Sequence, residues 1–164
     1  MSKEEALEFI SRPVSSVKTI RCSSYHNGDS VLIIGDAAHA ISPSLGQGCN
    51  AALEDALILN ELLDEYGDNF AQVLEQFSLR RKNDAYAVAE MSEFGFPSSK
   101  KLMIQFILRE RFQQILHNLF PQRCKPSMIN MLVESTIPYV EIYNSNKAWL
   151  SYVKKVNQQS TKNL

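Results

Sequence analysis

One stretch decides the fold of this chain: Val31-Leu-Ile-Ile-Gly-Asp36-Ala-Ala-His39-Ala-Ile-Ser-Pro43-Ser-Leu-Gly46-Gln-Gly48-Cys-Asn50. Its apolar start, Val31–Ile34, predicts a short buried strand that ends at Gly35. Asp36 then carries a carboxylate at the carboxyl end of that strand. After a loop that contains Pro43, a Gly-Gln-Gly turn opens a helix, which we expect to begin near Cys49.

The loop between Asp36 and this helix has the chemistry of a ligand site. A helix N-terminus offers free backbone N–H groups and the positive end of the helix dipole to an electron-rich or anionic group. The Asp36 carboxylate can accept hydrogen bonds from hydroxyl groups. A ligand with a polyol chain and an electron-rich head satisfies both features, and a reduced flavin is such a ligand.

The motif Gly35-Asp-Ala-Ala-His39, followed by Pro43 and Gly46-Gln-Gly48-Cys-Asn50, resembles the second flavin motif of the FAD-dependent aromatic monooxygenases of the para-hydroxybenzoate hydroxylase type. Within that family, the upstream stretch Val17–His26 is most similar to the kynurenine 3-monooxygenases. The similarity extends from about Leu7 through Tyr139. The resemblance implies an enzyme that uses FAD and NAD(P)H to insert one oxygen atom of O2 into a small aromatic substrate.

The resemblance also implies roles for single residues. The implied cofactor-binding residues are Asp36, Pro43, Gly46, Gly48, Cys49 and Asn50. Asp36 would bind the ribityl chain, and Pro43 would pack beside the flavin ring. The N–H groups of Cys49 and Asn50 would face the pyrimidine side of the ring and stabilise negative charge there. We expect Cys49 to be buried and to contribute its backbone rather than its thiol.

Two further residues match positions near the substrate in the kynurenine hydroxylases. They are Gln47, which could instead be a solvated turn residue, and Tyr139, which could instead be a half-buried core aromatic. The segment Glu93–Ser99 departs from the family pattern, because Gly95 stands where the family has an asparagine that helps to hold the substrate. Ser44 stands where an aromatic residue often lines the pocket. The amino-acid carboxylate of a bound kynurenine would lose a hydrogen-bonding partner at such a site, which is costly when the group is buried. These departures argue against kynurenine itself as the substrate.

No residue is assigned to catalysis or to a metal. His39 belongs to the structural turn of the motif, and we expect it to shape that turn rather than to transfer protons. Arg80 and Arg81, followed by Asp84, predict a helical ion pair on a solvated face. The chain has three cysteines without the spacing of a disulfide framework or a metal knuckle.

Composition narrows the possible partners. The 164 residues include 17 basic and 18 acidic ones, a net charge of −1, which gives no electrostatic case for binding nucleic acid. The chain shows no secretory signal and no apolar run of about 18 residues, so we expect no transmembrane segment and a cytoplasmic protein. A Gly-x-Gly-x-x-Gly fingerprint for the ADP part of FAD does not occur in the sequence. We therefore expect the C-terminal part of a longer enzyme. A truncated gene, a split gene and an excised piece all stay open, and the N-terminal half of the same enzyme is one candidate partner.

Periodicity and breaker residues predict an α+β fold, mostly α, in which a β-hairpin and a flavin-binding loop lead into a helical region. The predicted strands are Val17–Tyr25 and Val31–Ile34. The first predicted helix covers residues 3–10, and the second ends at Gly67 and carries an apolar stripe of Ala52, Ala56, Leu59 and Leu63. The third is capped by Asp68 and ends at Gly95 and Pro97, and the fourth runs through Ile104 to Leu119 and stops at Pro121. Two shorter helices are predicted at Met128–Val133 and Asn146–Val156. We divide the chain into a C-terminal part of the FAD-binding domain (1–66), a helical region over the substrate pocket (67–156) and a disordered tail (157–164).

Two other functions stay open on the sequence. The chain could be a non-catalytic, truncated remnant that acts at most as a helical interaction module. It could also keep the flavin but serve a different reaction of the same superfamily, such as epoxidation or reduction.

Overall fold

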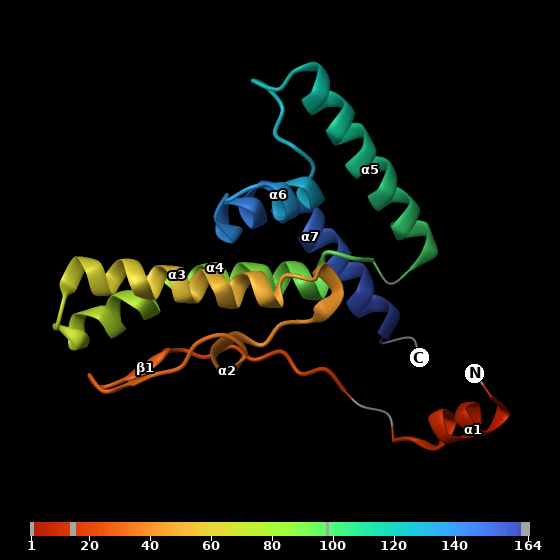
Figure 1. Cartoon of the computed structure of the whole chain (residues 1–164). Helices are drawn as coiled ribbons and strands as arrows, with labels where there is room; N and C mark the ends of the chain where they lie inside the picture. Colours follow the sequence, from red (N-terminus) through yellow and green to blue (C-terminus); the bar gives the residue numbers. More distant parts are fainter. Residues whose placement is uncertain (1, 14–15, 98, 162–164) are drawn as a thin grey trace.

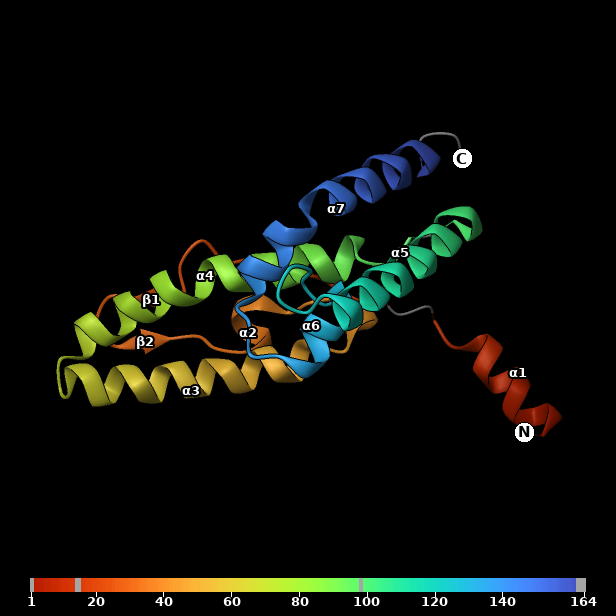
Figure 2. The same cartoon turned by 90° about the horizontal axis from the view of Figure 1, so that it is seen from above.

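The computed structural model describes residues 2–13, 16–97 and 99–161, which form a mostly helical molecule with one small hairpin (Figure 1). The elements are α1 (Lys3–Ser11), β1 (His26–Asn27), β2 (Val31–Leu32), α2 (Asp36–His39), the 3-10 helix η1 (Pro43–Leu45), α3 (Gly48–Tyr66), α4 (Phe70–Phe94), α5 (Lys100–Leu119), α6 (Met128–Glu134) and α7 (Tyr139–Thr161). The long helices α3 and α4 lie side by side, with the hairpin and α2 along one side and α6 and α7 on the other (Figures 1 and 2). The predicted class, α+β and mostly α, is confirmed.

Local capping chemistry sets most helix ends. Ser2 forms a capping box at the start of α1, which confirms the predicted first helix. Gly67 ends α3 with a φ of 57°, a conformation that favours glycine. The prediction that Asp68 caps α4 is wrong by one residue, because the Asn69 side chain accepts the hydrogen bond from the first turn.

The sheet is smaller than predicted. β1 and β2 pair antiparallel, with His26 opposite Leu32 and Asn27 opposite Val31. The predicted strand Val17–Tyr25 is wrong, because this stretch is irregular in the structure. The predicted buried strand Val31–Ile34 is also wrong in extent and burial, since only its first half pairs and Val31 is 52% exposed. Alternation predicts a strand only where a neighbouring strand is available, and within the described residues two residues of β1 are all that β2 pairs with.

The C-terminal helix is longer than predicted. α7 starts directly after Pro138 and continues to Thr161. Proline is tolerated at the start of a helix, because the N–H group that it lacks would have no acceptor within the helix there. The predicted start at Asn146 is therefore too late. The predicted tail is wrong for residues 157–161, which are helical, while residues 162–164 lie outside the described residues. Residues 157–164 contain no Gly or Pro that would break a helix, so polar composition alone misplaced this boundary. None of the described helices, α7 included, combines the length and the apolar character needed to cross a membrane.

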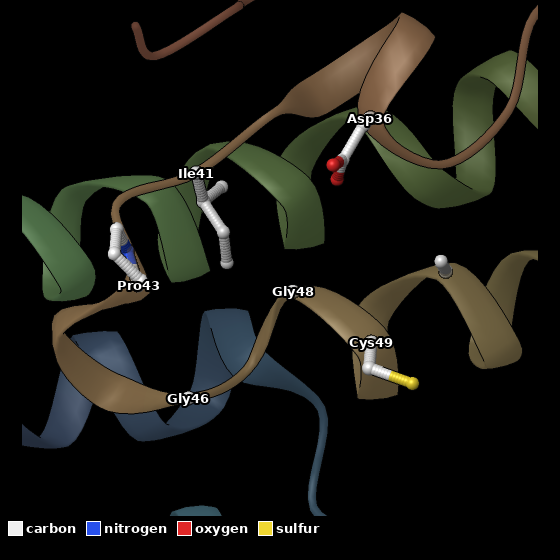
Figure 3. A pocket seen from close by; sticks show the side chains of 7 residues that line it. Asp36, Ile41, Pro43, Gly46, Gly48 and Cys49 are labelled. Carbon is white, nitrogen blue, oxygen red and sulfur yellow. The ribbon is translucent and has the colours of Figure 1, made fainter. Parts of the chain in front are cut away.

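Two tight turns shape the loop between α2 and α3. Gly35 precedes α2 with a φ of 57°, and Gly46 follows η1 with a φ of 66°. Both values lie where side chains other than glycine are strained. After Gly46 the chain enters α3 at Gly48, so the expected helix start near Cys49 is confirmed to within one residue (Figure 3).

Two buried apolar clusters hold the helices together. One joins the hairpin segment and α2 to α3 and α4 and contains Tyr25, Ala38, Leu62, Val73, Leu74, Phe77 and Ala85. The other joins the start of α3 to α4, α5, α6 and α7 and includes Ile41, Ala51, Val88, Met91, Phe106, Met128, Met131 and Ile142. Each cluster contains residues from both sides of position 66, the proposed boundary between the first two domains. Core packing therefore does not separate these two parts, and the boundary stays a prediction.

The buried stripe of α3 is displaced by one residue from the predicted one. Its fully buried members are Ala51, Asp55 and Leu62, whereas Ala56 and Leu63 of the predicted stripe are exposed. A search for apolar periodicity misses this stripe because its centre is a carboxylate.

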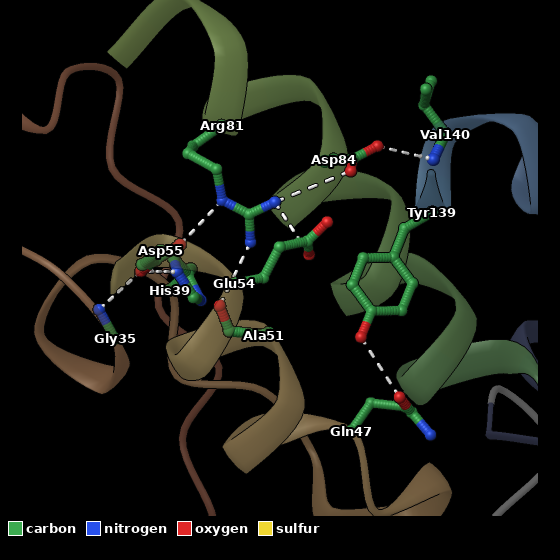
Figure 4. A network of polar contacts seen from close by, with 10 residues as sticks. All are labelled: Gly35, His39, Gln47, Ala51, Glu54, Asp55, Arg81, Asp84, Tyr139 and Val140. Carbon is green, nitrogen blue, oxygen red and sulfur yellow. Dashed lines mark hydrogen bonds and ion pairs between the residues drawn. The ribbon is translucent and has the colours of Figure 1, made fainter. Parts of the chain in front are cut away.

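Arg81 buries its guanidinium between α3 and α4 (Figure 4). Its Nε donates to Asp55 Oδ1 at 2.7 Å, and its Nη2 donates to the Ala51 carbonyl at 3.2 Å. Its Nη1 forms ion pairs with Glu54 at 2.9 Å and with Asp84 at 3.6 Å. The predicted solvated pair is therefore wrong for Arg81, whose side chain is 0% exposed. The buried Asp55 and the partly exposed Glu54 on the adjacent helix α3 account for the difference.

Asp55 extends this network to the turn before α2. Its Oδ2 accepts the Gly35 N–H at 2.7 Å and lies 2.6 Å from His39 Nε2 (Figure 4). His39 and Asp55 are both almost fully buried. The network thus connects α4, α3 and the Gly-Asp motif in one series of charge-assisted contacts.

Replacing the buried Arg81 should lower the free energy of unfolding much more than replacing its exposed neighbour Arg80. Arg81→Met leaves Asp55 and Glu54 without their cation, which costs about 3–5 kcal/mol in comparable buried pairs. Arg80→Met removes an exposed ion pair with Glu65 and should cost less than about 1 kcal/mol. Urea denaturation of both variants measures the free energy of unfolding. Equal losses of unfolding free energy in the two variants would contradict the prediction that Arg81 stabilises the fold through its buried ion pairs.

The network should also make stability sensitive to acid. Burial alone raises the pKa of Asp55, but hydrogen bonds from His39, Gly35 and Arg81 outweigh it and hold the pKa below its ordinary value. The stabilisation is therefore complete above the unfolded-state value of about 3.9 and is lost as pH falls through the lower folded-state pKa. Asp55→Asn should lower stability at neutral pH and flatten the loss below about pH 4. Asp68→Asn, at an exposed position, is the control, and an unchanged acid slope in Asp55→Asn would contradict the prediction.

Candidate functional site

An open cavity of about 490 Å³ lies against the N-terminal end of α3 (Figure 3). Its lining residues are Asp36, Ile41, Pro43, Gly46, Gly48, Cys49 and Ala52. Five of the six residues expected to bind the cofactor therefore meet in one cavity. The sixth, Asn50, lines a second cavity on another side of the same helical turn.

The two polar features expected of a flavin site are both accessible here. The Asp36 carboxylate is exposed and points toward the space between α2 and the start of α3 (Figure 3). Gln47 precedes α3 without capping it by its side chain, and the first backbone bond of the helix runs from the Ala51 N–H to the Gln47 carbonyl at 2.9 Å. The N–H groups of residues 48–50 thus have no acceptor within the helix.

Cys49 is exposed, so the prediction that it is buried is wrong. It sits on the first turn of α3 and lines the cavity (Figure 3). The expected role of its backbone N–H does not depend on the thiol.

The donor set of this cavity fits a flavin. A carboxylate for hydroxyl groups and uncapped amides for an electron-rich ring edge stand beside the apolar Ile41, Pro43 and Ala52. A Cβ on Gly48 would lie 3.9 Å from Ile41 Cγ1, an ordinary van der Waals contact, so a side chain there would take up part of the space that these two residues line.

The second cavity, of about 420 Å³, lies between α3 and the segment that joins α6 to α7. Its lining is mostly apolar and consists of Gln47, Asn50, Leu53, Glu54, Leu57, Met131, Leu132, Val133, Ser135, Thr136, Ile137, Tyr139 and Ile142. Apolar walls with a few convergent polar groups are typical of small-molecule sites. Both residues expected near the substrate, Gln47 and Tyr139, are in this lining.

Gln47 and Tyr139 touch each other across the fold (Figure 4). The Tyr139 hydroxyl donates to Gln47 Oε1 at 3.1 Å, and Asn50 Nδ2 donates to the same oxygen at 3.2 Å. Gln47 is only 4% exposed, so the alternative of a solvated turn residue is wrong. Burial raises the pKa of Tyr139 to about 12, with a smaller contribution from the charge of Glu54, so its hydroxyl keeps the proton at neutral pH.

Asp84 fixes the start of the helix that carries Tyr139. Its Oδ1 accepts the Val140 N–H in the first turn of α7 at 2.8 Å, while its other oxygen faces Arg81 (Figure 4). The buried network therefore reaches both sides of the site, at Gly35 beside the first cavity and at Tyr139 in the second.

The departures from the family pattern have structural counterparts. The Ser44 hydroxyl donates to the Ser92 carbonyl and ties η1 to α4. A Cβ on Gly95 would collide with the Met91 carbonyl oxygen, so an asparagine would require the end of α4 to shift. Ser99 caps α5 by accepting the Leu102 N–H at 3.2 Å, whereas Ser98 lies outside the described residues.

Sequence reasoning missed the residues that support the site: Glu54, Asp55, Arg81 and Asp84. One signal was available, since Asp55 lies four residues after Ala51 and seven before Leu62, on the stripe that the structure buries. A carboxylate at such a position requires a buried cation, and an arginine on the next helix is a ready candidate.

Comparison with known proteins gives the family of this chain. Residues 3–92 match the family model described as FAD binding domain. The chain is 34% identical over 131 residues to kynurenine 3-monooxygenase of Caenorhabditis elegans, covering 79% of this chain and 28% of that protein. It is 38% identical over 136 residues to kynurenine 3-monooxygenase of Legionella pneumophila, covering 82% and 30%. It is also 34% identical over 139 residues to violacein synthase of Chromobacterium violaceum, covering 84% and 32%.

The chain thus spans less than a third of the length of these curated relatives. The family match covers more than half of the chain and includes every residue expected to bind the cofactor. The chain therefore belongs to the FAD binding domain family, and the kynurenine 3-monooxygenases are among its relatives.

Proposed function

We propose that the chain supplies the flavin-facing and substrate-facing part of an FAD- and NAD(P)H-dependent monooxygenase that hydroxylates a small aromatic compound. The observation that carries the proposal is the pair of cavities on two sides of the first turn of α3. One has the donors of a flavin site, and the other has apolar walls with a few polar groups. A flavin and an aromatic ring held on either side of one helical turn would be close neighbours.

Residues of the first cavity would hold the flavin. Asp36 accepts hydrogen bonds from ribityl hydroxyls, and the N–H groups of Cys49 and Asn50 stabilise negative charge at the ring edge, aided by the dipole of α3. Pro43 and Ile41 cover apolar ring surface and exclude water. The bound flavin supplies the oxygen chemistry, while the chain contributes binding and electrostatics.

Residues of the second cavity would hold the substrate. Leu53, Met131 and Ile137 offer apolar surface to an aromatic ring. Tyr139, protonated at neutral pH, presents a hydroxyl whose acceptor capacity is free for a polar group of the substrate, and Asn50 lies beside it. The ADP part of FAD would be bound by the N-terminal half of the enzyme, because the 164 residues of this sequence contain no Gly-x-Gly-x-x-Gly motif.

Flavin content tests the proposal first. The chain purified alone should be nearly colourless, and the chain produced together with an upstream polypeptide that carries a dinucleotide-binding motif should absorb at about 450 nm. In that complex, Asp36→Asn should weaken FAD binding about tenfold or more, because a carboxylate–hydroxyl bond is lost. Titration of the flavin-depleted complex with FAD measures the change.

Asp68→Asn provides the matched control, since it removes an exposed carboxylate outside the cavity. It should bind FAD as the unchanged chain does. Folded, colourless protein in both preparations would overturn the proposal and leave the non-catalytic helical module. Equal FAD affinity of Asp36→Asn and Asp68→Asn would reject the role of Asp36 and leave the rest of the proposal standing.

Tyr139 should govern the affinity for the aromatic ligand. In the flavin-loaded complex, small aromatic compounds are titrated, with kynurenine first, and binding is followed through the visible spectrum of the flavin. Tyr139→Phe should weaken binding of any compound that perturbs this spectrum by about tenfold, the worth of one hydrogen bond in a buried site.

Tyr143→Phe is the control for this substitution, because Tyr143 lies one turn further along α7 and lines a different cavity. Its affinity should stay within about twofold of the unchanged complex. Unchanged affinity in Tyr139→Phe would remove this residue from the site. A complex that binds flavin but responds to no aromatic compound would retain the cofactor site and reject the substrate class.

A further inference from the structure

Glu54 places a carboxylate in the wall of the second cavity. It lies four residues after Asn50, so these two side chains share one face of α3, in line with Gln47 just before the helix. The Glu54 side chain is 33% exposed, and Figure 4 shows its carboxylate between the guanidinium of Arg81 and the ring of Tyr139. The cavity therefore contains one acidic side chain that is backed by a buried cation.

This carboxylate has unused capacity to accept hydrogen bonds. Its Oε2 lies 2.9 Å from Arg81 Nη1, but the contact is not aligned as a hydrogen bond, and neither atom has another partner among the described residues. Arg81 donates instead to Asp55 and to the Ala51 carbonyl. The other oxygen of Glu54, Oε1, receives no hydrogen bond in the described part of the chain. It is therefore open to a donor on a ligand in the cavity.

The other polar side chains of the lining use their donors on the protein itself. Tyr139 Oη and Asn50 Nδ2 both donate to Gln47 Oε1, at 3.1 and 3.2 Å. The Ser135 hydroxyl donates to a backbone carbonyl at 2.6 Å. A tyrosine hydroxyl has a single hydrogen to donate, so Tyr139 can only accept from a ligand. With Glu54, these side chains offer more free acceptors than free donors, which favours a ligand with O–H or N–H groups.

The charge of the lining points the same way. The described residues around this cavity include no lysine, arginine or histidine. Arg81 lies behind the wall with a side chain that is 0% exposed, so a ligand carboxylate would meet the negative charge of Glu54 with no cation in reach. Burial raises the pKa of Glu54 more than the charge of Arg81 lowers it. A donor or a cation placed against this carboxylate would offset part of the cost of its burial.

We propose that the second cavity selects aromatic compounds that carry a hydrogen-bond donor and rejects aromatic carboxylates, with Glu54 as the residue that distinguishes them. This selection rests on the proposed function, since it takes the second cavity as the substrate site. Glu54 Oε1 accepts one O–H or N–H group of the ligand, and Tyr139 Oη is placed to accept another. A site built to accept a donor is left unpaired by a ligand that lacks it, so one residue can discriminate strongly.

Three probes with the same ring test the selection on the whole chain. At neutral pH benzylamine presents a cation, phenol a neutral donor and benzoate an anion. Each is titrated into the chain, and binding is followed in amide NMR spectra through the side-chain amides of Gln47 and Asn50. We expect benzylamine and phenol to bind at least tenfold more tightly than benzoate. The measurement needs no flavin, so it reports on the cavity alone.

Glu54→Gln keeps the size of the side chain and removes its charge. It should lower the affinity for benzylamine about tenfold or more and bring benzoate to within about threefold of benzylamine. The matched control is Glu61→Gln, which removes the same charge from an exposed position further along α3, outside the cavity. Its affinities should stay within about twofold of those of the unchanged chain. Circular dichroism shows whether each variant keeps its helix content.

Leu57→Lys tests the selection without touching the buried network. Leu57 lines the cavity and is 58% exposed, so the fold tolerates a lysine there. The added cation should reverse the order of affinities, with benzoate binding more tightly than benzylamine. An unchanged order would overturn the proposal, because the probes would then bind elsewhere.

Three further results would overturn it: binding of none of the probes, benzoate binding as tightly as benzylamine to the unchanged chain, and an equal loss in Glu54→Gln and Glu61→Gln. The fate of the proposed function is read separately. A complex that takes up FAD while its second cavity prefers benzoate keeps the monooxygenase and rejects the role of Glu54. A chain that selects donors but never takes up FAD keeps the selection and rejects the monooxygenase.

Discussion

The buried guanidinium of Arg81 is the constraint on which the rest of this structure depends. It neutralises carboxylates on α3 and α4 that could not otherwise be dehydrated, since an isolated buried carboxylate is far too costly. With Asp55 held in this way, the second oxygen of that carboxylate is free to fix the Gly35 N–H and His39. The tight turn at Gly35, which presents Asp36 to the first cavity, is thus fixed by its contacts with the ion-paired Asp55.

The pKa values of two neighbouring carboxylates are shifted in opposite directions, although burial raises both. The pKa of Asp55 falls because several donors outweigh its burial, while burial raises the pKa of Glu54 more than its pairing with Arg81 lowers it. Asp55 therefore favours the folded state once it is ionised, and Glu54 favours it while it holds a proton. The two residues are adjacent in sequence, and only their positions on the helix separate their behaviour.

Features set by neighbours in sequence were predictable, and features set by distant pairing were not. Gly67 and the Gly-Gln-Gly turn act within a few residues, so the end of α3 and the start of that helix follow from them. Arg81 reaches Asp55 from 26 residues away, and periodicity assigns such residues to a solvated face. The predicted strand Val17–Tyr25 failed for a related reason, because a strand exists only where another part of the chain pairs with it.

The first turn of α3 serves both cavities, with Gly48 and Cys49 on one side and Gln47 and Asn50 on the other. A ligand on either side that orders this turn does so for both, and the second ligand then finds it already ordered. With both proposed ligands bound, their affinities would be thermodynamically linked, and each would change the affinity of the other by the same factor. One shared helical turn would then make the two cavities cooperative without any larger movement of the fold.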